Sequence, residues 1–282
     1  MSTMLIDNVV LSDEDFRAIS DMVYDHCGIH LHDGKKELVR ARLAKLLRQR
    51  GCAEFPQYMR HVLEDTSGRE FSLLIDAVST NLTSFFREEG HFEFLAGRFL
   101  PALVEKKRRA GSLRVRGWSA GCSSGEEPYS IAITLIESLP GRERFDVKVL
   151  ATDISTSILD KARLGVYDAE RTAPVPPALK SRYLVGHKVN GRRVFDVGPA
   201  LRRVVVFKYL NLMQDWPIRG PLDFIFCRNV MIYFDKPSQQ RLIRRFYDLL
   251  DSGGVLFTGH SESLTGIEHA FRYIQPTIYA KP

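Results

Sequence analysis

The sequence lacks any run of about 18 apolar residues, so we expect no helix that spans a membrane. Its first 16 residues have neither a basic start nor a long apolar stretch, which argues against a secretory signal. Only four cysteines are present, without a CxxC pair, at positions 27, 52, 122 and 227. This scarcity argues against a zinc site and a disulfide framework and favours a reducing cytosol. We therefore expect a cytoplasmic protein that holds no metal and does not insert into a membrane.

The residues that are present are typical of a globular protein. Hydrophobic residues make up 44% and charged residues 26% of the 282 residues, a length that suggests about two domains. Collagen-like, low-complexity and disordered classes are thereby excluded. The net charge of +6 is uneven, because residues 1–80 carry 10 basic and 13 acidic side chains and residues 81–282 carry 30 and 21. Such a protein can bind nucleic acid, an anionic membrane or an acidic protein, although mild basicity also serves solubility alone.

The first 80 residues predict a small all-helical domain. Ser12, followed by Glu14 and Asp15, matches an N-cap with an acidic first turn. Apolar residues then recur at helical spacing, and further helices are expected at about 35–50, 54–65 and 69–80. No strand-like alternation occurs before residue 110. We therefore assign 1–80 to a helical N-terminal domain and 81–110 to a linker with helices that leads into a second domain.

Residues 111–282 predict an α/β domain. Alternating elements are expected, with strands at 113–118, 147–151, 204–207, 222–226, 255–258 and 273–280, and helices at 126–139, 156–164 and 238–250. This order is typical of a Rossmann-like, mostly parallel sheet with helices on both faces. Between 166 and 203 the alternation fails, and Asn190-Gly191 is a strong signal for a hairpin turn. We therefore expect a small antiparallel β-hairpin insertion at about 166–203.

Polar residues follow four successive strands of this predicted sheet. They are the segment 119–128 after the first strand, Asp153 after the second, Asn211-Leu212 after the third and Arg228-Asn229 after the fourth. Such sheets bind ligands beyond the carboxyl ends of their strands, and an acid after the second strand commonly accepts hydrogen bonds from ribose hydroxyls. Any one of these groups could be ordinary helix-capping or loop chemistry. Together they favour a nucleoside ligand.

The segment 119–128 argues against a phosphate as part of that ligand. It contains glycines, but it is not GxGxxG and it lacks the P-loop lysine. Glu126 and Glu127 begin the next helix and would repel a phosphate, whereas they suit a cation or a ligand rich in hydrogen-bond donors. The same two acids also favour the positive end of a helix dipole, so a purely structural role stays open at this point.

Five motifs give the sequence a family resemblance over nearly its whole length. They are NLTSFFRE (81–88), SAGCSSGEEPYSIA (119–132), ATDIS (151–155), NLM (211–213) and FCRNVMIYF (226–234). In this order they resemble the CheR-type chemotaxis receptor methyltransferase family. The resemblance implies S-adenosylmethionine-dependent O-methylation of glutamate side chains on the cytoplasmic helices of chemoreceptors during adaptation. The products would be glutamyl methyl esters and S-adenosylhomocysteine.

The resemblance also implies a set of site residues. The cofactor contacts would be Asn81, Thr83, Arg87, Glu127, Asp153, Asn211, Leu212, Arg228 and Asn229, with Glu126 as an alternative to its neighbour Glu127. An acidic glycine loop suits the ammonium and the sulfonium of this cofactor. A glutamate acceptor is already ionised at neutral pH and needs no strong base, only alignment and removal of water. Arg87 and Tyr233 are the candidates for positioning the cofactor and the acceptor; their alternatives are a surface salt bridge and a half-buried core aromatic.

The second predicted helix is strongly basic on one face. Arg40, Arg42, Lys45 and Arg48 lie opposite an apolar stripe that includes Val39, Leu43 and Leu47. A run of charges is often only a solvated face. Because the inferred substrate is a glutamate-rich helical bundle, we instead expect these four residues to steer and bind it, with domain 1–80 serving substrate recognition.

Two other functions compete with this one. Asn229-Val-Met-Ile-Tyr233 faintly resembles the Asn-Pro-Pro-Tyr site of nucleic-acid N-methyltransferases, but no prolines follow Asn229 and no basic stripe rich in aromatics is present. A cofactor-sensing module without enzymatic activity is the other alternative, and retention of Arg87 and Tyr233 argues against it. We expect a monomer that binds no nucleic acid. The resemblance leaves open whether its insertion binds a receptor C-terminal tail peptide, as it does in some family members and not in others.

Overall fold

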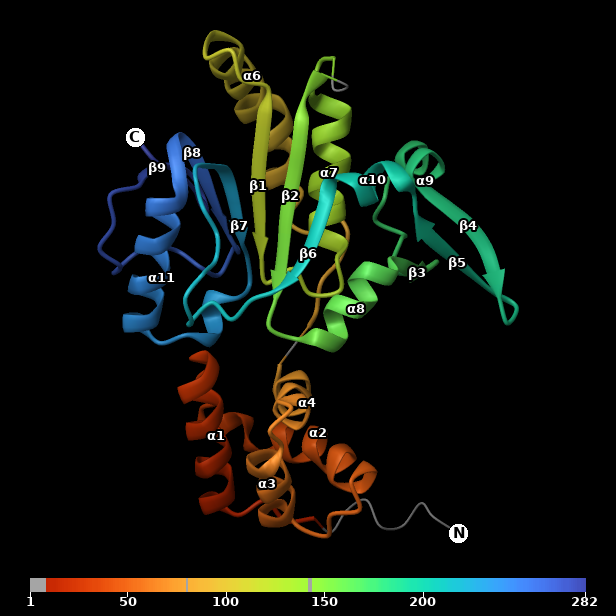
Figure 1. The fold of residues 1–282 in the computed structure, drawn as a ribbon, viewed down its shortest axis with the longest axis vertical. Helices are drawn as coiled ribbons and strands as arrows, with labels where there is room; N and C mark the ends of the chain where they lie inside the picture. The colour runs from red at the N-terminus through yellow and green to blue at the C-terminus, as the bar shows by residue number, and fades with distance from the viewer. Residues whose placement is uncertain (1–8, 80, 142–143) are drawn as a thin grey trace.

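The computed structural model describes residues 9–79, 81–141 and 144–282 and contains a helical part and an α/β part (Figure 1). The first eight residues, where the expected absence of a secretory signal falls, lie outside the described residues, as does Thr80 at the expected domain boundary. Among the described residues, none of the helices combines the length and the apolar character that crossing a bilayer requires.

Four helices form the N-terminal part, as the sequence predicted. They are α1 (Asp13–Cys27), α2 (Lys36–Gln49), α3 (Phe55–Glu64) and α4 (Arg69–Val78). Ser12 caps α1, since its hydroxyl accepts a hydrogen bond from the Asp15 N–H at 3.0 Å. Gly28 ends the helix with φ 70°, and a Cβ at Gly28 would lie 2.7 Å from Met213 Cγ in the other domain. A glycine is therefore required both by the turn and by the close approach of the two domains.

The segment after Thr80 leads into the α/β domain through a nearly continuous helical stretch. It contains α5 (Gly90–Phe94), a π-helix (Leu95–Phe99) and α6 (Leu100–Arg109). Its aromatic and aliphatic side chains, such as Phe92, Leu95 and Leu103, are buried against one face of the sheet.

The sheet has seven strands in the order β6-β2-β1-β7-β8-β10-β9. Its strands are β1 (Arg114–Ala120), β2 (Asp146–Asp153), β6 (Val205–Tyr209), β7 (Leu222–Cys227), β8 (Leu250–Thr258), β9 (Arg272–Gln275) and β10 (Ile278–Ala280). The five strands from β6 to β8 pair in parallel, and β10 pairs antiparallel with both β8 and β9. The prediction of a single strand at 273–280 is wrong. The chain turns at Thr277, which has φ 60°, and returns as a second strand.

Helices cover both faces of this sheet, as predicted. The remaining long helices are α7 (Glu126–Ser138), α8 (Thr156–Leu164) and α11 (Lys236–Leu249). Along β7, Phe224 and Phe226 pack into the cluster that includes α6 and α7. The alternate residues Ile225 and Cys227 pack on the other side with α11. Burial on both faces explains why β7 reads as a continuous apolar run.

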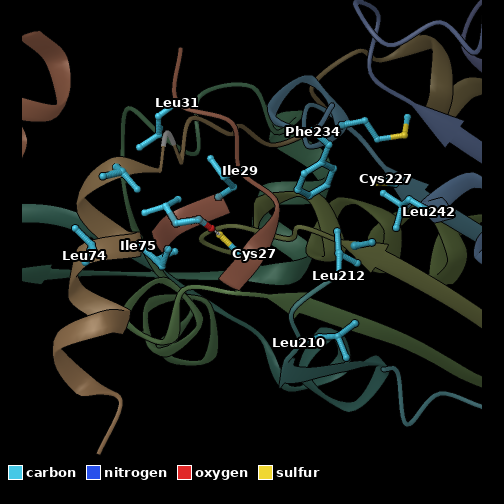
Figure 2. Close-up of a cluster of buried hydrophobic side chains, with 14 of the residues drawn as sticks. Cys27, Ile29, Leu31, Leu74, Ile75, Leu210, Leu212, Cys227, Phe234 and Leu242 are labelled. Atoms are coloured by element: carbon cyan, nitrogen blue, oxygen red, sulfur yellow. Dashed lines mark hydrogen bonds between the residues drawn. The ribbon is translucent and has the colours of Figure 1, made fainter. Parts of the chain in front are cut away.

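The hydrophobic core on the α11 side continues into the helical domain. One cluster of buried side chains contains Ile19 and Leu43 of the helical domain together with Leu212 and Phe234 of the α/β domain. Figure 2 shows the junction, where Ile29 and Cys27 face Leu212 and Phe234. The two domains therefore share one hydrophobic core and pack directly against each other.

The predicted insertion is present and is larger than a hairpin. It forms a three-stranded antiparallel sheet in the order β3-β5-β4, with β3 (Val166–Asp168), β4 (Leu184–Val189), β5 (Arg192–Val197) and the short helices α9 (Pro177–Tyr183) and α10 (Pro199–Val204). The turn between β4 and β5 is Asn190-Gly191, with φ 49° and 77°, as the sequence predicted. A strand of only three residues, β3, gives too short a pattern to be recognised from sequence.

Candidate functional site

A cavity lies beyond the carboxyl ends of the parallel strands, between the sheet and the helical domain. All nine residues predicted as cofactor contacts line it, as does Tyr233. They come from the segment after Thr80 and from the loops that follow β1, β2, β6 and β7. The four basic residues predicted on α2 are absent from its described lining, although Lys35, just before that helix, is part of it. The topology therefore gathers the strand-end residues at one rim, as expected for this type of sheet.

The backbone around the cavity is held in unusual conformations. Four residues other than glycine that have positive φ lie here: Phe86, Glu88, Ser123 and Asn229. Gly121, with φ 83°, lies so close to the neighbouring loop that a Cβ would be 2.3 Å from Val230 Cγ2. Conformations of this kind are maintained only where surrounding contacts fix them, and they cluster at functional sites.

Asp153 ends β2 with its side chain buried at the cavity wall. Its two carboxylate oxygens accept hydrogen bonds from the N–H groups of Ser123 at 2.8 Å and Ser155 at 3.0 Å. The N-cap of α8 is Ser155, whose hydroxyl accepts from the Ile158 N–H at 3.1 Å, so Asp153 is not needed for capping. Burial raises the pKa of Asp153. A carboxylate has about four lone pairs, more than these hydrogen bonds use, so a hydroxyl donor in the cavity could still bind it.

The two adjacent glutamates at the start of α7 point to different places. Glu127 lines the cavity, accepts a hydrogen bond from Ser119 Oγ at 2.7 Å and lies 3.4 Å from Arg228 Nη1. Glu126 is fully buried and binds Arg171 Nη1 at 2.8 Å, which ties α7 to the insertion. Burial raises the pKa of both carboxyls. Of the two, Glu127 is therefore the one that faces the cavity.

Arg228 is the central cation of the rim. Its side chain is 1% exposed, and its guanidinium lies 3.1 Å from Glu88 Oε2 and donates to the Arg87 carbonyl. It also lies over the ring of Phe92, with 5.7 Å between the guanidinium carbon and the centroid. Glu88 was not predicted as a site residue, although it ends the NLTSFFRE motif. It holds Arg228 in place without lining the cavity.

Glu262 supports the loop that follows β7 and was also not predicted as a site residue. Its carboxylate accepts hydrogen bonds from the N–H groups of Asn229 at 2.6 Å, Gly259 at 2.7 Å and Ile232 at 3.1 Å. The group is buried, and burial raises its pKa. Glu262 follows β8. The argument that drew attention to polar residues after the first four strands would therefore have predicted Glu262 if it had been applied to this strand.

The wall opposite the sheet comes from the helical domain and is mainly apolar. It consists of Cys27, Ile29, Leu31 and Val78, together with Ser79 and Lys35. Asn211 joins the two walls, because its Nδ2 donates to the His26 carbonyl at 2.6 Å. Its Oδ1 accepts from the Met213 N–H at 2.9 Å, so this side chain holds the loop and the domains together. In sequence these apolar residues cannot be distinguished from ordinary core positions.

The two candidate positioning residues lie at the rim. Arg87 is half-buried, and its Nη1 donates to the Leu82 carbonyl at 2.8 Å. Tyr233 is half-buried after β7, and its backbone carbonyl accepts from the His30 N–H at 2.9 Å. The Lys35 ammonium lies 5.1 Å from the centroid of the Tyr233 ring. A guanidinium, a phenol and an ammonium therefore all line the cavity, and the last two lie beside each other.

The basic face of α2 divides into two kinds of residue. Lys45 and Arg48 are exposed, and Arg40 lies 2.8 Å from Glu37 on the same helix. Arg42 is half-buried, and its Nη1 donates to the carbonyls of Val78 at 3.3 Å and Ser79 at 2.8 Å. Arg42 therefore caps the end of α4, so its guanidinium is not presented with the other three.

The fold and this cavity define an S-adenosylmethionine-dependent methyltransferase of the Rossmann-like class. Two family models match the chain: "CheR methyltransferase, all-alpha domain" over residues 14–79 and "CheR methyltransferase, SAM binding domain" over residues 81–280. The chain belongs to the CheR methyltransferase family.

Curated relatives agree with this assignment. The chemotaxis protein methyltransferase of Escherichia coli is 41% identical over 280 residues, which cover 98% of this chain and 93% of the relative. Chemotaxis protein methyltransferase 2 of Pseudomonas aeruginosa is 44% identical over 273 residues, covering 95% and 92%. Among solved structures, an S-adenosylmethionine-dependent methyltransferase from Methanosarcina mazei has a TM-score of 0.31 and 17% identity over 52% of each chain, too little to add to the assignment.

Proposed function

We propose that this chain is a protein-glutamate O-methyltransferase that transfers the methyl group of S-adenosylmethionine to glutamate side chains on chemoreceptor cytoplasmic helices. The observation that carries the proposal is the cavity, in which the acids, amides and arginines expected for this cofactor meet at one rim. The relatives named chemotaxis protein methyltransferases supply the substrate class. The enzyme acts in the cytoplasm, where those receptor helices lie, and contributes to chemotactic adaptation.

The chemistry of the cavity fits this cofactor. Asp153 offers acceptor lone pairs to the ribose hydroxyls, and Glu127 offers a negative charge to the cationic methionine moiety. The apolar wall at Ile29 and Val78, together with Leu212 of the α/β domain, suits the faces of the adenine ring. When bound, the cofactor supplies a methyl group activated by positively charged sulfur. Its transfer to an acceptor carboxylate would give the methyl ester and leave S-adenosylhomocysteine, so that no further reactant is needed.

The residues of this chain have a positioning task in that reaction. The acceptor is ionised at neutral pH, so no proton moves and neither a base nor a metal ion is required. Arg87 supplies fixed donors for a carboxylate, and Tyr233 supplies a wall and a hydroxyl that keep the reacting groups in line. Lys35 adds a second cation beside Tyr233. Burial of the acceptor carboxylate between these groups excludes the water that would otherwise solvate it.

The helical domain recognises the substrate in this proposal. Lys45 and Arg48 on α2 expose their charges, and Lys35, just before this helix, lines the cavity itself. A glutamate-bearing receptor helix is acidic, so this surface steers it toward the site. The enzyme acts as a monomer on protein and not on nucleic acid.

The insertion provides a separate contact for a receptor C-terminal tail. In the sheet order β3-β5-β4, strand β4 lies at an edge. Val185 and Val189 on this strand are 60% and 45% exposed. An extended peptide could add to such an edge through main-chain hydrogen bonds. Calorimetry with receptor tail peptides checks this contact, and shortening the Asn190-Gly191 hairpin should abolish peptide binding while cofactor binding persists.

The experiment that tests the proposed function is incubation of the purified protein with methyl-labelled S-adenosylmethionine and a panel of receptor cytoplasmic fragments. We expect label on protein that is released by mild base, as carboxyl methyl esters are. A matched fragment in which the labelled glutamates are replaced by alanine should stay unlabelled. Label on nucleic acid, or base-stable label on protein, would contradict the proposal.

A further inference from the structure

Three side chains of the types that bind metal ions lie close together beside Arg228 and outside the lining of the cavity. They are Glu88, His91 and His260, whose nearest oxygen and nitrogen atoms all lie within 4.8 Å of one another. Glu88 Oε2 is 3.5 Å from His91 Nδ1 and 3.9 Å from His260 Nε2. None of the three lines the cavity, and the role proposed above for the chain uses neither histidine.

The hydrogen bonds of His91 place its proton on the nitrogen that faces away from this cluster. The Thr277 hydroxyl donates to the Pro276 carbonyl at 2.8 Å, so its oxygen is free to accept a hydrogen bond from His91 Nε2, also at 2.8 Å. In the neutral ring Nδ1 then carries a lone pair and no proton. His91 is 2% exposed, and Nδ1 has no hydrogen-bond partner.

A buried lone pair thus faces a carboxylate oxygen with no hydrogen between them. The Arg228 guanidinium lies 3.1 Å from the same oxygen, but Nδ1 has no hydrogen-bond partner, and a cation bound between the two atoms would give it one. A third atom that can bind a metal, His260 Nε2, lies on the solvent side, since that side chain is 63% exposed. We propose that Glu88, His91 and His260 form a binding site for a transition metal ion of the Zn²⁺ class, with solvent water completing the coordination.

The ligand set and its spacing fit such an ion. Two imidazoles and one carboxylate are typical of Zn²⁺ and Co²⁺, and the hard ions Mg²⁺ and Ca²⁺ prefer oxygen alone. Metal–ligand bonds near 2.1 Å in a tetrahedron place the ligand atoms about 3.4 Å apart. The Glu88–His91 distance of 3.5 Å already matches this value. His260 lies 3.9 Å from Glu88 and within 4.8 Å of His91, so its exposed side chain would move by up to about 1.4 Å to complete the set. The hydrogen bond from His91 Nε2 to Thr277 orients the ring, as outer contacts do in metal sites.

The site is coupled to the cofactor cavity through Glu88. The oxygen that a metal would bind, Oε2, is the one that Arg228 contacts at 3.1 Å. A bound cation competes with Arg228 for this oxygen and repels the guanidinium, which also pairs with Glu127 in the cavity wall. The metal should therefore weaken cofactor binding, and by linkage the cofactor should weaken metal binding by the same factor. This coupling rests on the proposed cofactor site, whereas metal binding itself does not.

The test uses the full chain, stripped of metal and freed of any affinity tag. Zn²⁺ binding is followed by calorimetry and Co²⁺ binding by its visible spectrum, both without cofactor. We expect one equivalent to bind, with a Co²⁺ spectrum free of thiolate charge transfer. His260→Ala should weaken binding about tenfold or more. His61→Ala, which removes another exposed histidine, is the matched control and should bind as the original chain does.

Absence of binding, equal binding by His260→Ala and the original chain, or a thiolate signature from the buried cysteines would overturn the proposal. The coupling is measured separately, as S-adenosylhomocysteine affinity with and without saturating Zn²⁺. Zn²⁺ should lower that affinity in the original chain and leave it unchanged in His260→Ala. Failure of S-adenosylhomocysteine to bind in the absence of metal would instead count against the proposed function.

Discussion

The two walls of the cavity are built on different principles. The wall from the α/β domain includes apolar residues such as Leu212 but carries most of the polar groups of the cavity. These groups are fixed by neighbouring side chains and by the backbone: Arg228 by Glu88, Asp153 by Ser123, Asn229 by Glu262. The wall from the helical domain is apolar and belongs to a hydrophobic core that runs through both domains. The first wall can fix the orientation of a ligand, and the second can exclude water from it. If this division is correct, substitutions in the polar wall should have large and specific effects, and those in the apolar wall small and general ones.

The largest effect is expected from Glu262→Gln. The amide keeps the size of the side chain but turns one of its two acceptors into a donor, which then faces a backbone N–H in a buried place. We expect a loss of about 3 kcal/mol in the free energy of unfolding and weaker S-adenosylhomocysteine binding, because the 228–232 loop loses its support. Urea unfolding and calorimetry measure the two quantities. Glu268→Gln, an exposed position in the same segment, is the control and should change neither. Unchanged stability in Glu262→Gln would contradict the expectation that substitutions behind the polar wall have larger effects than those in the apolar wall.

Asp153→Asn tests the polar wall without removing volume. Loss of a charged acceptor should weaken S-adenosylmethionine and S-adenosylhomocysteine alike by about 1.5–3 kcal/mol, because both carry the ribose. The effect should also depend on pH. Burial raises the pKa of Asp153, and ribose donors bind its ionised form, so affinity should fall as pH falls through this raised pKa. The decline begins above the usual titration range of an aspartate. Calorimetry across pH checks the sign: a decline that persists in Asp153→Asn would assign it to another group.

This division also explains what could be predicted from sequence. The polar wall was predictable, because β-strand periodicity locates the strand ends and parallel topology brings them together. Asp153, Asn211 and Arg228 were found in this way. Glu262 was open to the same argument, whereas the support from Glu88 depends on how the segment after Thr80 packs, which strand order does not reveal.

The apolar wall was not predictable. Ile29 and Val78 follow the same apolar pattern as residues that contact only protein, and only the packing of the domains decides which of them face the cavity. The surroundings of Arg42 were equally impossible to predict from the sequence pattern. A helical wheel places Arg42 with Arg40, Lys45 and Arg48, but its hydrogen bonds to the end of α4 depend on a neighbouring helix. The choice between Glu126 and Glu127 likewise required the position of Arg171 in the insertion.

Val78→Ala tests the apolar wall directly. Val78 is buried in the shared core and also lines the cavity, whereas Val62 is buried in the same core away from it. Both alanine variants should lower stability by about 2 kcal/mol. Only Val78→Ala should also weaken S-adenosylhomocysteine, by about 1 kcal/mol or roughly fivefold. Equal cofactor affinity in the two variants would show that the helical domain encloses the ligand without contributing to its binding.

The smallest effect is expected outside the cavity, on the exposed face of α2. Replacing Lys45 and Arg48 by glutamate should raise the receptor KM a few-fold, since single exposed charge pairs contribute about 1 kcal/mol or less. Cofactor affinity should stay as in the original chain, because neither residue lines the cavity. The receptor KM of the original chain should rise with salt, because exposed charges are screened beyond about 10 Å at 0.1 M, and the double variant should respond less. Arg108→Glu with Arg109→Glu makes the same charge change on α6, at the end of the molecule opposite the helical domain (Figure 1). Equal KM values for the two double variants would mean that net charge, and not the position of the basic face, attracts the receptor.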